Sequence, residues 1–528
     1  MARTLGQPLV QPGQRPVEKR QRTAAPAGAT ETEIKLALPG AQGVSPDALA
    51  AQLARVPALA RRKAVRQQVY SVYYDTPDQQ LRRQRVALRL RRVGSEQPLQ
   101  WLQTLKTAGR SDSALSQRGE WEMPVPGPAL ALELLHDSPW PGMDPDGTLA
   151  PALAPCFVTD FERTVWRVTA RDGSEIEVAL DVGTITAGHR SAPLCELELE
   201  LVAGPPGALF SLARRIARTV AVLPLAASKA QRGYALGQAD TPMAVQAQPP
   251  VLSRDVSLQT MARSLLGEAL QQFTANLHTL LGADGPELVH QARVGWRRFR
   301  SLWRLLRPAL PGVPCPALPA LQPLLDSLGA LRDVDVAATQ TLPLWTERYV
   351  AGDASRAPAW QALQTALLDA AQQQRTAVRQ TLAQPAVGAA LLELSQWLES
   401  LETAALAPAV VACGGKRPAV RWLRRRVQRL LHRLERTWAD AKHLPGAASP
   451  DAEGLHRVRI LSKRLRYSTQ ALSPLLPRRL QRQHDVAQQW QTQLGTARDV
   501  AQASALAARW GAPPEVVGFL RGAAAAVA

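Results

Sequence analysis

The sequence predicts two domains, a closed antiparallel β-barrel with outer helices in the N-terminal half and an all-α C-terminal domain of two repeated helical units. Three observations predict this fold class. Charged and apolar residues alternate along six segments before residue 235, helical spacing replaces that alternation after residue 253, and one motif recurs in the second half at an interval of 166 residues. A chain of 528 residues also exceeds what one ordinary hydrophobic core holds.

The strands are predicted from period-two alternation, because successive side chains of a strand point to opposite faces. The segments are ETEIKLAL (31–38), VALRLRR (86–92), LQTLK (102–106), RGEWEM (118–123), EIEVALD (175–181) and CELELEL (195–201). A solvated sheet face would explain one such strand. Six strands carrying both signs of charge favour a closed barrel with a hydrophilic interior, whose outer apolar face is covered by helices such as 205–223.

The domain boundaries follow from composition. Residues 236–253 are rich in Pro and Gln without periodicity and predict a linker between a barrel domain at 29–235 and a helical domain at 254–528. The repeated units are expected at about 257–405 and 418–528. Residues 1–28 predict a disordered basic tail, since they lack a signal-peptide core.

The charge balance restricts the class of partner. There are 63 Lys and Arg against 44 Asp and Glu, and 34 basic against 20 acidic residues follow residue 250. This excess attracts polyanions of every kind, including nucleic acid and phosphate polymers. The four cysteines are widely spaced and no apolar run of membrane length occurs, so we expect a cytoplasmic protein that is not a membrane protein.

The charged positions of the strands predict a metal and phosphate site. Glu31, Glu33 and Lys35 share one strand face, as do Arg89 and Arg91, and so do the glutamates of 196–200. Carboxylates gathered inside a barrel repel one another unless a cation is present, and oxygen ligands suit Mg²⁺ or Mn²⁺. Arginine and lysine on other strands then neutralise the phosphate oxygens, which is the arrangement that phosphoryl transfer to water requires.

The first half resembles the CYTH family of triphosphate tunnel enzymes over about 31–234. The motifs that carry the likeness occur in the family's order: ETEIK (31–35), YYDTPD (73–78), ALRLRR (87–92), QTLK (103–106), QRGEWE (117–122), FERTVW (161–166), ALDVG (179–183), ELELEL (196–201) and SKAQRGY (228–234). The resemblance implies a tunnel that hydrolyses inorganic triphosphate with Mg²⁺ or Mn²⁺.

Carried over residue by residue, the resemblance implies two sets of site residues. The metal-site carboxylates are Glu31, Glu33, Glu196 and Glu198, joined by Asp181 and Glu200. The catalytic and phosphate-contacting cations are Lys35, Arg89, Arg91, Lys106, Arg163 and Lys229, with Arg118, Glu120 and Glu122 as further assignments.

The recurring motif of the second half predicts a basic helix face. His290, Arg293, Arg297 and Arg300 fall within an arc of about 80° on a helix, and His456, Arg459, Lys463 and Arg466 reproduce that arc. Each set is followed by an LGxxRD string, beginning at Leu328 and at Leu494. A solvated charged face is the simpler interpretation of one helix. Two acid-free faces at the same spacing favour an anion-binding surface.

This half resembles the CHAD family, the conserved-histidine α-helical domains, over about 257–528. The paired histidine helices and the LGxxRD strings carry the likeness. It implies two pseudo-symmetric helical bundles that bind inorganic polyphosphate in a basic groove through the eight residues of the two arcs. Arg332 and Arg498 each precede an aspartate, so a structural ion pair is the alternative for them.

The sequence therefore predicts an inorganic triphosphatase with a polyphosphate-binding domain. The alternatives are a non-catalytic polyphosphate-binding protein of storage granules and an adenylyl cyclase, for which no base-recognising pocket is visible. Nucleic acid is disfavoured as a partner because no aromatic residues interleave the basic positions. Oligomeric state, metal preference, substrate chain length, the identity of the base and coupling between the domains stay open.

Overall fold

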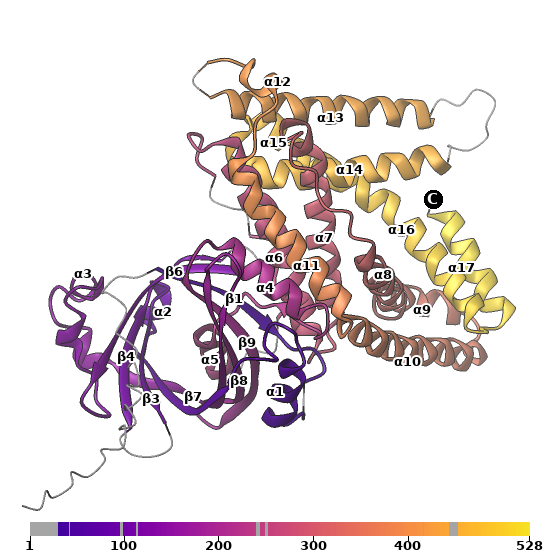
Figure 1. Ribbon diagram of the computed structural model, residues 1–528. Helices are drawn as coiled ribbons and strands as arrows, with labels where there is room; N and C mark the ends of the chain where they lie inside the picture. The colour runs from indigo at the N-terminus through magenta and orange to yellow at the C-terminus, as the bar shows by residue number, and fades with distance from the viewer. Residues whose placement is uncertain are drawn as a thin grey trace, which may run out of the picture.

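The computed structural model describes residues 30–41, 43–94, 99–111, 114–238, 243–248, 252–415, 417–442 and 452–527. The predicted basic tail, residues 1–28, lies outside the described residues. Figure 1 shows a β-barrel formed by the first half of the chain, beside a larger set of helices formed by the second half.

Eight antiparallel strands close the barrel. Their order is β1-β9-β8-β7-β2-β3-β4-β6, and β6 pairs with β1 to complete the circle. The strands are β1 (Thr30–Ala37), β2 (Val65–Asp75), β3 (Ala87–Val93), β4 (Gln100–Lys106), β6 (Leu115–Val125), β7 (Ala154–Thr169), β8 (Glu175–Ala187) and β9 (Arg190–Ala203). Two short strands, β5 (Arg110–Ser111) and β10 (Leu223–Pro224), pair with β6 and β1. The predicted closed barrel is confirmed, including its six alternating strands.

The outer face of the barrel is apolar and covered by helices, as the alternation predicted. Helices α1 (Pro46–Ala54) and α4 (Gly207–Ile216) cover the side formed by β1, β8 and β9, where Ile34, Leu197 and Phe210 are fully buried. On another side, α2 (Gln80–Arg83), η1 (Leu132–Leu135) and α3 (Trp140–Met143) supply a second apolar cluster. Both clusters lie outside the barrel, whereas a third, smaller apolar cluster packs β2, β7, β8 and β9 against residues 230–236.

Helix α5 (Lys229–Gly237) lies inside the outline of the barrel (Figure 1). Ser228 caps it: its hydroxyl accepts from the Gln231 amide while the Gln231 side chain accepts from the Ser228 amide. Gly233 lets the helix approach β7, because a Cβ there would lie 2.2 Å from the Phe157 ring. This close packing places Lys229, at the start of the helix, in the barrel interior.

The described residues from 258 to 526 form helices and no strand, as predicted. The principal helices are α6 (Leu258–Leu280), α7 (Pro286–Leu306), α8 (Gln322–Val336), α9 (Leu342–Val350), α10 (Ala357–Leu382), α11 (Pro385–Ser400), α13 (Pro418–Lys442), α14 (Ala452–Leu472), α16 (Gln483–Arg509) and α17 (Pro514–Ala526), and two shorter ones are α12 (Pro408–Val411) and α15 (Arg478–Gln481). None of the helices in the described part of the chain is long and apolar enough to cross a membrane.

The helical repeat is visible in the helix ends. Helix α7 ends at Leu306 and α14 at Leu472, and each continues into a 3₁₀ turn, η3 (Arg307–Ala309) and η8 (Ser473–Leu475), at the same interval of 166 residues. Helix α6 packs on α7 as α13 packs on α14, and α7 and α14 contact each other. The two histidine helices therefore meet where the repeats join.

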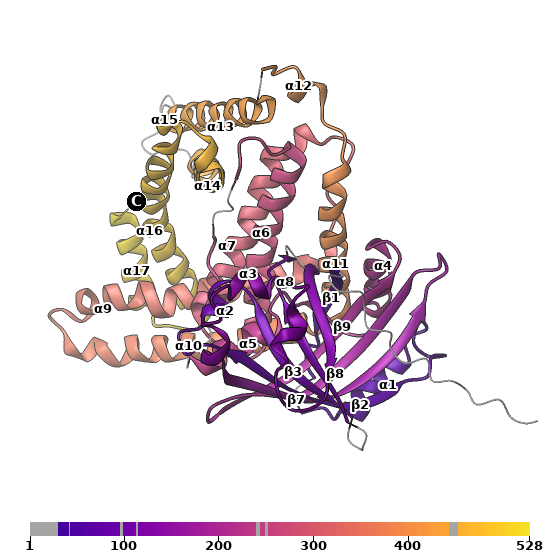
Figure 2. The same cartoon turned by 90° about the vertical axis from the view of Figure 1, so that its left-hand side faces the viewer.

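The helical domain packs directly on the barrel domain, and Figure 2 shows α11 beside α4 from a second side. A Cβ at Gly388 of α11 would lie 2.0 Å from the Val222 carbonyl oxygen, so the backbones meet there. Leu392 of α11 belongs to the core of the barrel domain, and Leu223 of β10 belongs to the core of the helical domain. Since β10 pairs with β1, the interface continues into the strand that carries Glu31 and Glu33.

Candidate active site

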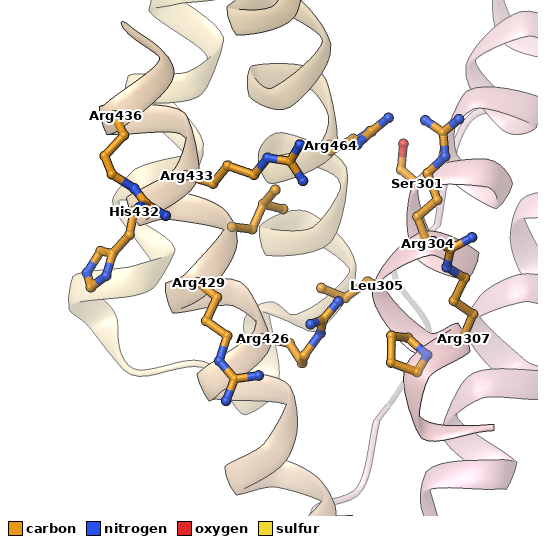
Figure 3. Close-up of a pocket in the computed structure, with 12 residues that line it drawn as sticks. Ser301, Arg304, Leu305, Arg307, Arg426, Arg429, His432, Arg433, Arg436 and Arg464 are labelled. Carbon is orange, nitrogen blue, oxygen red and sulfur yellow. The ribbon is translucent and has the colours of Figure 1, made fainter. Parts of the chain in front are cut away.

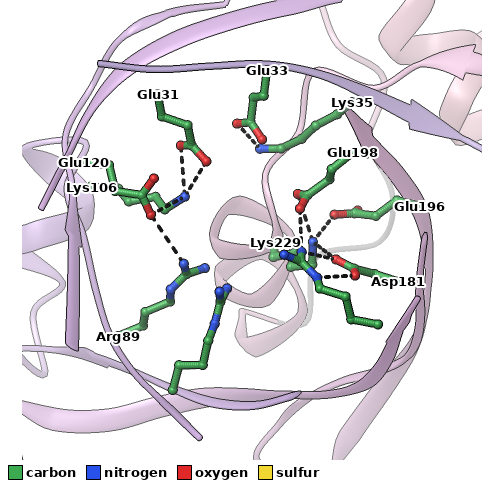
Figure 4. A network of polar contacts seen from close by, with 12 residues as sticks. Glu31, Glu33, Lys35, Arg89, Lys106, Glu120, Asp181, Glu196, Glu198 and Lys229 are labelled. Atoms are coloured by element: carbon green, nitrogen blue, oxygen red, sulfur yellow. Dashed lines mark hydrogen bonds and ion pairs between the residues drawn. The ribbon is translucent and has the colours of Figure 1, made fainter. Parts of the chain in front are cut away.

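The barrel interior is lined by acidic and basic side chains of seven strands, β1, β3, β4 and β6 to β9, and of α5 (Figure 4). On β1, Glu31, Glu33 and Lys35 point inward because they alternate with Ile34 and Leu36 of the outer core. The cavity between these side chains has a volume of about 1330 Å³. Its lining includes Glu31, Lys35, Arg89, Arg91, Lys106, Arg118, Glu120, Glu122, Arg163, Glu198, Glu200 and Lys229.

One wall of the interior gathers three carboxylates. Oxygens of Asp181, Glu196 and Glu198 lie within 4.8 Å of one another, and the first two side chains are 0% exposed. Strand register causes this, because Asp181 pairs with Glu196 between β8 and β9 and Glu198 follows two residues later. A cluster of three buried carboxylates requires a cation.

Lys229 supplies that positive charge in the structure. Its Nζ lies 2.7 Å from Asp181, 2.5 Å from Glu196 and 3.0 Å from Glu198. Arg163 adds a two-pronged contact to Asp181, with both distances 2.7 Å, and a further contact of 2.7 Å to Glu198. Burial opposes ionisation, but Arg163 and Lys229 lower the pKa of the Asp181 carboxyl and hold the pKa of the Glu198 carboxyl well below its usual range.

The β1 glutamates are paired with a different set of cations. Glu31 accepts from Lys106 at 2.8 and 2.9 Å and from Arg118 at 2.7 Å. Glu33 accepts from Arg118 at 2.9 Å and lies 2.8 Å from Lys35 Nζ. The two carboxyls respond differently: burial raises the pKa of Glu33, whereas Lys106 and Arg118 outweigh burial at Glu31 and lower its pKa.

Arg89 and Arg91 form the opposite, more positive wall. Both are buried and lie 3.5 and 4.0 Å from Glu122, and Arg89 also lies 3.6 Å from Glu120. These separations are longer than those of the other pairs, and the Arg91 Nε is buried without a hydrogen-bond partner. Burial and the neighbouring Arg89 lower the pKa of Arg91 to about 10. The guanidinium groups of this wall therefore have donors available to bind an anion.

The structure brings together all the predicted barrel residues, with Glu200 beside Glu33 and Glu177 in the strand register. It also adds two that sequence reasoning missed. Arg232 of α5 contacts Glu196 at 2.6 Å, and its position three residues after Lys229 on a helix was the available signal. The hydroxyl of Tyr73 lines the cavity, where Arg89 and Arg91 lower its pKa although burial opposes this.

The carboxylate set fits a hard divalent ion. Asp181, Glu196 and Glu198 offer only oxygen donors, which Mg²⁺ and Mn²⁺ prefer, and they already bind a cationic group in Lys229. A metal there replaces the charge that the Lys229 ammonium provides. The chemistry of the donors therefore agrees with a metal site.

The predicted groove residues of the helical domain divide between two surroundings. Arg293, Arg297, Arg459 and Lys463 act on one another electrostatically, together with Arg498. Burial and these arginines lower the pKa of Lys463 to about 7. His290 lies beside Arg332 and Arg466, and burial with these neighbours lowers its pKa to about 4. We call this set, His290, Arg293, Arg297, Arg332, Arg459, Lys463, Arg466 and Arg498, the groove cluster.

One predicted residue, Arg300, lies away from the groove cluster: it is exposed and acts on Arg304 and Arg464 instead. His456 is exposed. The alternative of an ion pair at Arg332 and Arg498 is not realised, since neither has a carboxylate within 4 Å among the described residues. The groove cluster is therefore mainly basic, although Asp333, Asp499 and Glu287 act electrostatically on its members from longer range.

A barrel with paired charges in its interior, joined to a helical domain with unpaired basic charges, defines the class: a tunnel barrel fused to a basic α-helical domain. Comparison with known families agrees with both parts. The CYTH domain model matches residues 29–234 and the CHAD domain model matches residues 264–508. The chain belongs to the proteins in which a CYTH domain is followed by a CHAD domain.

Individual relatives are similar to parts of the chain. An inorganic triphosphatase from Haemophilus influenzae is 38% identical over 168 residues, which is 32% of this chain and 45% of the relative. The CHAD domain from the plant Ricinus communis is 28% identical, covers 54% of this chain and 91% of that one, and has a TM-score of 0.44. A putative adenylyl cyclase from Hippeastrum, described as having a dominant triphosphatase activity, is 18% identical over 39% of this chain and 95% of its own, with a TM-score of 0.29.

Proposed function

We propose that the barrel hydrolyses inorganic triphosphate to pyrophosphate and phosphate with the help of Mg²⁺ or Mn²⁺. One observation carries the proposal: a carboxylate wall and an arginine wall face the same cavity of about 1330 Å³. A triphosphate needs both, because its oxygens bind a metal on one side and arginine forks on the other. The similarity to an inorganic triphosphatase supports the same substrate.

In this proposal the basic residues bind and orient the phosphate chain. Arg89 and Arg91 are the primary phosphate contacts, because their present carboxylate partners are distant. Lys106, Arg118 and Lys35 exchange a glutamate for a phosphate oxygen when substrate enters, and Arg163 and Lys229 do so on the other wall. Fixed positive charge at the developing phosphoryl charge accounts for much of the rate of such reactions.

The carboxylates hold the metal and position water. Asp181, Glu196 and Glu198 are the proposed principal ligands, with Glu31, Glu33 and Glu200 next to them. When bound, the metal polarises phosphate oxygens and lowers the pKa of a coordinated water. Glu33 is suited to accept a proton from water, because burial raises its pKa above that of an ordinary carboxyl.

For the helical domain we propose binding of inorganic polyphosphate by the groove cluster and the rest of the two predicted arcs. The support is the concentration of unpaired cations there, which is costly unless an anion is bound. Residues 29–235 and 254–528 then act as a catalytic and a binding unit joined by 236–253. Such a protein would be cytoplasmic and could accumulate on polyphosphate granules.

A substrate panel tests the catalytic proposal. Phosphate release is measured from triphosphate, ATP, thiamine triphosphate and long-chain polyphosphate, each with Mg²⁺, Mn²⁺ or EDTA. We expect triphosphate to be preferred and EDTA to abolish turnover. Glu33→Ala and Arg91→Ala should lose activity with their circular dichroism unchanged, while Arg215→Ala on the exposed face of α4 should not.

Two results would contradict the proposal. Full activity of both Glu33→Ala and Arg91→Ala would remove the catalytic assignment. A wild-type chain that binds long polyphosphate but releases no phosphate from triphosphate with either metal would favour the non-catalytic alternative. Cyclic AMP formation from ATP would favour the cyclase.

A further inference from the structure

A second cavity, of about 700 Å³, lies between α13, α14 and the end of α7 (Figure 3). Four of the arginines that line it, Arg426, Arg429, Arg433 and Arg436, share one face of α13, since they are spaced by three or four residues. Arg304, Arg307 and Arg464 face them from the other helices. We call these seven arginines and the space between them the α13 pocket.

The charges of the α13 pocket are unpaired. No acidic residue lines it, and no carboxylate of the described residues forms an ion pair with any of its seven arginines. The Nε atoms of Arg426 and Arg464 are buried without a hydrogen-bond partner. Donors left unsatisfied at a buried position are costly, and arginine forks match the oxygens of phosphate and carboxylate.

The helical repeat provides an internal comparison. Arg464 of α14 corresponds to Arg298 of α7 at the interval of 166 residues. Arg298 is 1% exposed and neutralised, with a contact of 2.7 Å to Glu268 and a hydrogen bond of 2.6 Å to Gln272. The first repeat therefore supplies its own anion, whereas the second surrounds the equivalent arginine with more arginines.

The arginines of the α13 pocket also repel one another. Burial, Arg304 and Arg433 lower the pKa of Arg464 to about 10. Burial together with neighbouring arginines also lowers the pKa values of Arg304 and Arg426. Seven like charges held around one cavity are relieved by an external anion of high charge density.

We propose that the α13 pocket is a binding site for several adjacent phosphoryl groups of a condensed phosphate, separate from the groove cluster and from the barrel. The groove cluster contributes none of the residues that line it. A condensed phosphate is favoured over nucleic acid, because its charges are closely spaced and because His432 provides the only aromatic ring in the lining, so stacking of bases has no platform. The assignment does not depend on catalysis in the barrel.

The first test measures affinity. The full-length chain is titrated with tripolyphosphate and with long-chain polyphosphate in EDTA, in the wild type and in Arg429→Ala/Arg433→Ala, both of whose targets are exposed. We expect the double variant to bind long-chain polyphosphate about tenfold more weakly or worse, with a shallower dependence on salt. The matched control is Arg478→Ala/Arg479→Ala, which removes two exposed charges from α15 outside the pocket. Equal affinity of wild type and Arg429→Ala/Arg433→Ala would overturn the proposal.

The second test reads the site directly. Arginines are modified with phenylglyoxal and mapped by mass spectrometry, with and without each phosphate, in the wild type and in the groove variant Arg297→Ala/Lys463→Ala. Protection of Arg429, Arg433 and Arg436 that persists in the groove variant supports a separate site, and protection by tripolyphosphate alone assigns the site to free short anions. Absence of protection, or equal protection of Arg478 and Arg479, contradicts the proposal that the α13 pocket binds condensed phosphate. Equal protection by single-stranded DNA of matched charge would reject condensed phosphate as the ligand.

Discussion

The barrel and the helical domain hold their charges in opposite ways. In the barrel each cation of the carboxylate wall has acidic partners within about 3 Å, as Lys229 has three. In the helical domain the groove cluster and the α13 pocket contain cations with no carboxylate within 4 Å among the described residues. The barrel is therefore neutralised before a ligand arrives and must exchange partners. The α13 pocket, which no acidic residue lines, gains its counter-charge from the ligand.

Removal of Lys229 should have the largest effect. Lys229→Ala leaves Asp181, Glu196 and Glu198 without their shared cation, and breaking a buried pair costs about 3–5 kcal/mol. We expect a large fall in melting temperature in EDTA that Mg²⁺ or Mn²⁺ partly reverses, because the metal supplies the missing charge. Differential scanning calorimetry with and without metal checks this.

Arg232→Ala is the matched control for Lys229→Ala. It removes a cation that contacts only Glu196 of the cluster and is partly exposed, so a smaller loss is expected. If Lys229→Ala melts like the wild type in EDTA, or if metal does not favour the variant over the wild type, the carboxylate wall is not a cation site.

The second largest effect is expected at the arginine wall. Arg91→Ala should lower kcat/KM for triphosphate by about 10²–10³, the magnitude found when one donor to a developing charge is removed. Its stability should change little, because Arg91 lies 4.0 Å from Glu122, its carboxylate partner among the described residues, and because its loss relieves repulsion with the neighbouring Arg89. Steady-state kinetics and thermal melting on the same samples separate a catalytic effect from a loss of stability. A fall in melting temperature with unchanged kcat/KM would contradict the assignment of Arg91 to phosphate binding.

The sequence predicted most of the barrel and its charged set, but not how the charges pair. The alternation pattern did not predict strands β2 and β7, because some of their inward positions are uncharged. In the strand register Ser71 pairs with Arg91 and with Thr159, and Tyr73 pairs with Arg89. Pairing of Lys229 with three carboxylates depends on α5 entering the barrel, and that follows from packing at Gly233 and Phe157 rather than from any local pattern.

The helical domain shows the same limit. The arc of four basic residues on α7 was predicted as one face, yet the structure separates Arg300 from Arg297. The first half of α7 lies beside α8 and α14, and its end lies beside α13. The α13 arginines lie close together in the sequence, within 421–436, but only the fold shows which of them face Arg304 and Arg464.

A smaller effect is expected at the groove cluster. Arg297→Ala/Lys463→Ala should weaken polyphosphate binding. It should also reduce the slope of log affinity against log salt by about 1.4, since two fewer phosphate contacts release fewer counterions on binding. Triphosphate hydrolysis should be unchanged, because neither residue lines the barrel cavity. Titrations at several salt concentrations check the slope, and a lower hydrolysis rate in this variant would instead show that the two domains are coupled.

The smallest effect is a pH dependence of polyphosphate binding that originates at Lys463. In the free protein burial and Arg297, Arg459, Arg498 and Arg293 lower its pKa to about 7, so the side chain is increasingly neutral above that pH. Bound phosphates favour the ammonium, and binding then takes up a proton. Affinity should therefore fall several-fold between pH 6.5 and pH 8.5, with proton uptake visible as a buffer-dependent heat of binding. Lys463→Arg keeps the charge at every pH in this range and should flatten the profile; an equally steep profile in Lys463→Arg would place the titrating group elsewhere.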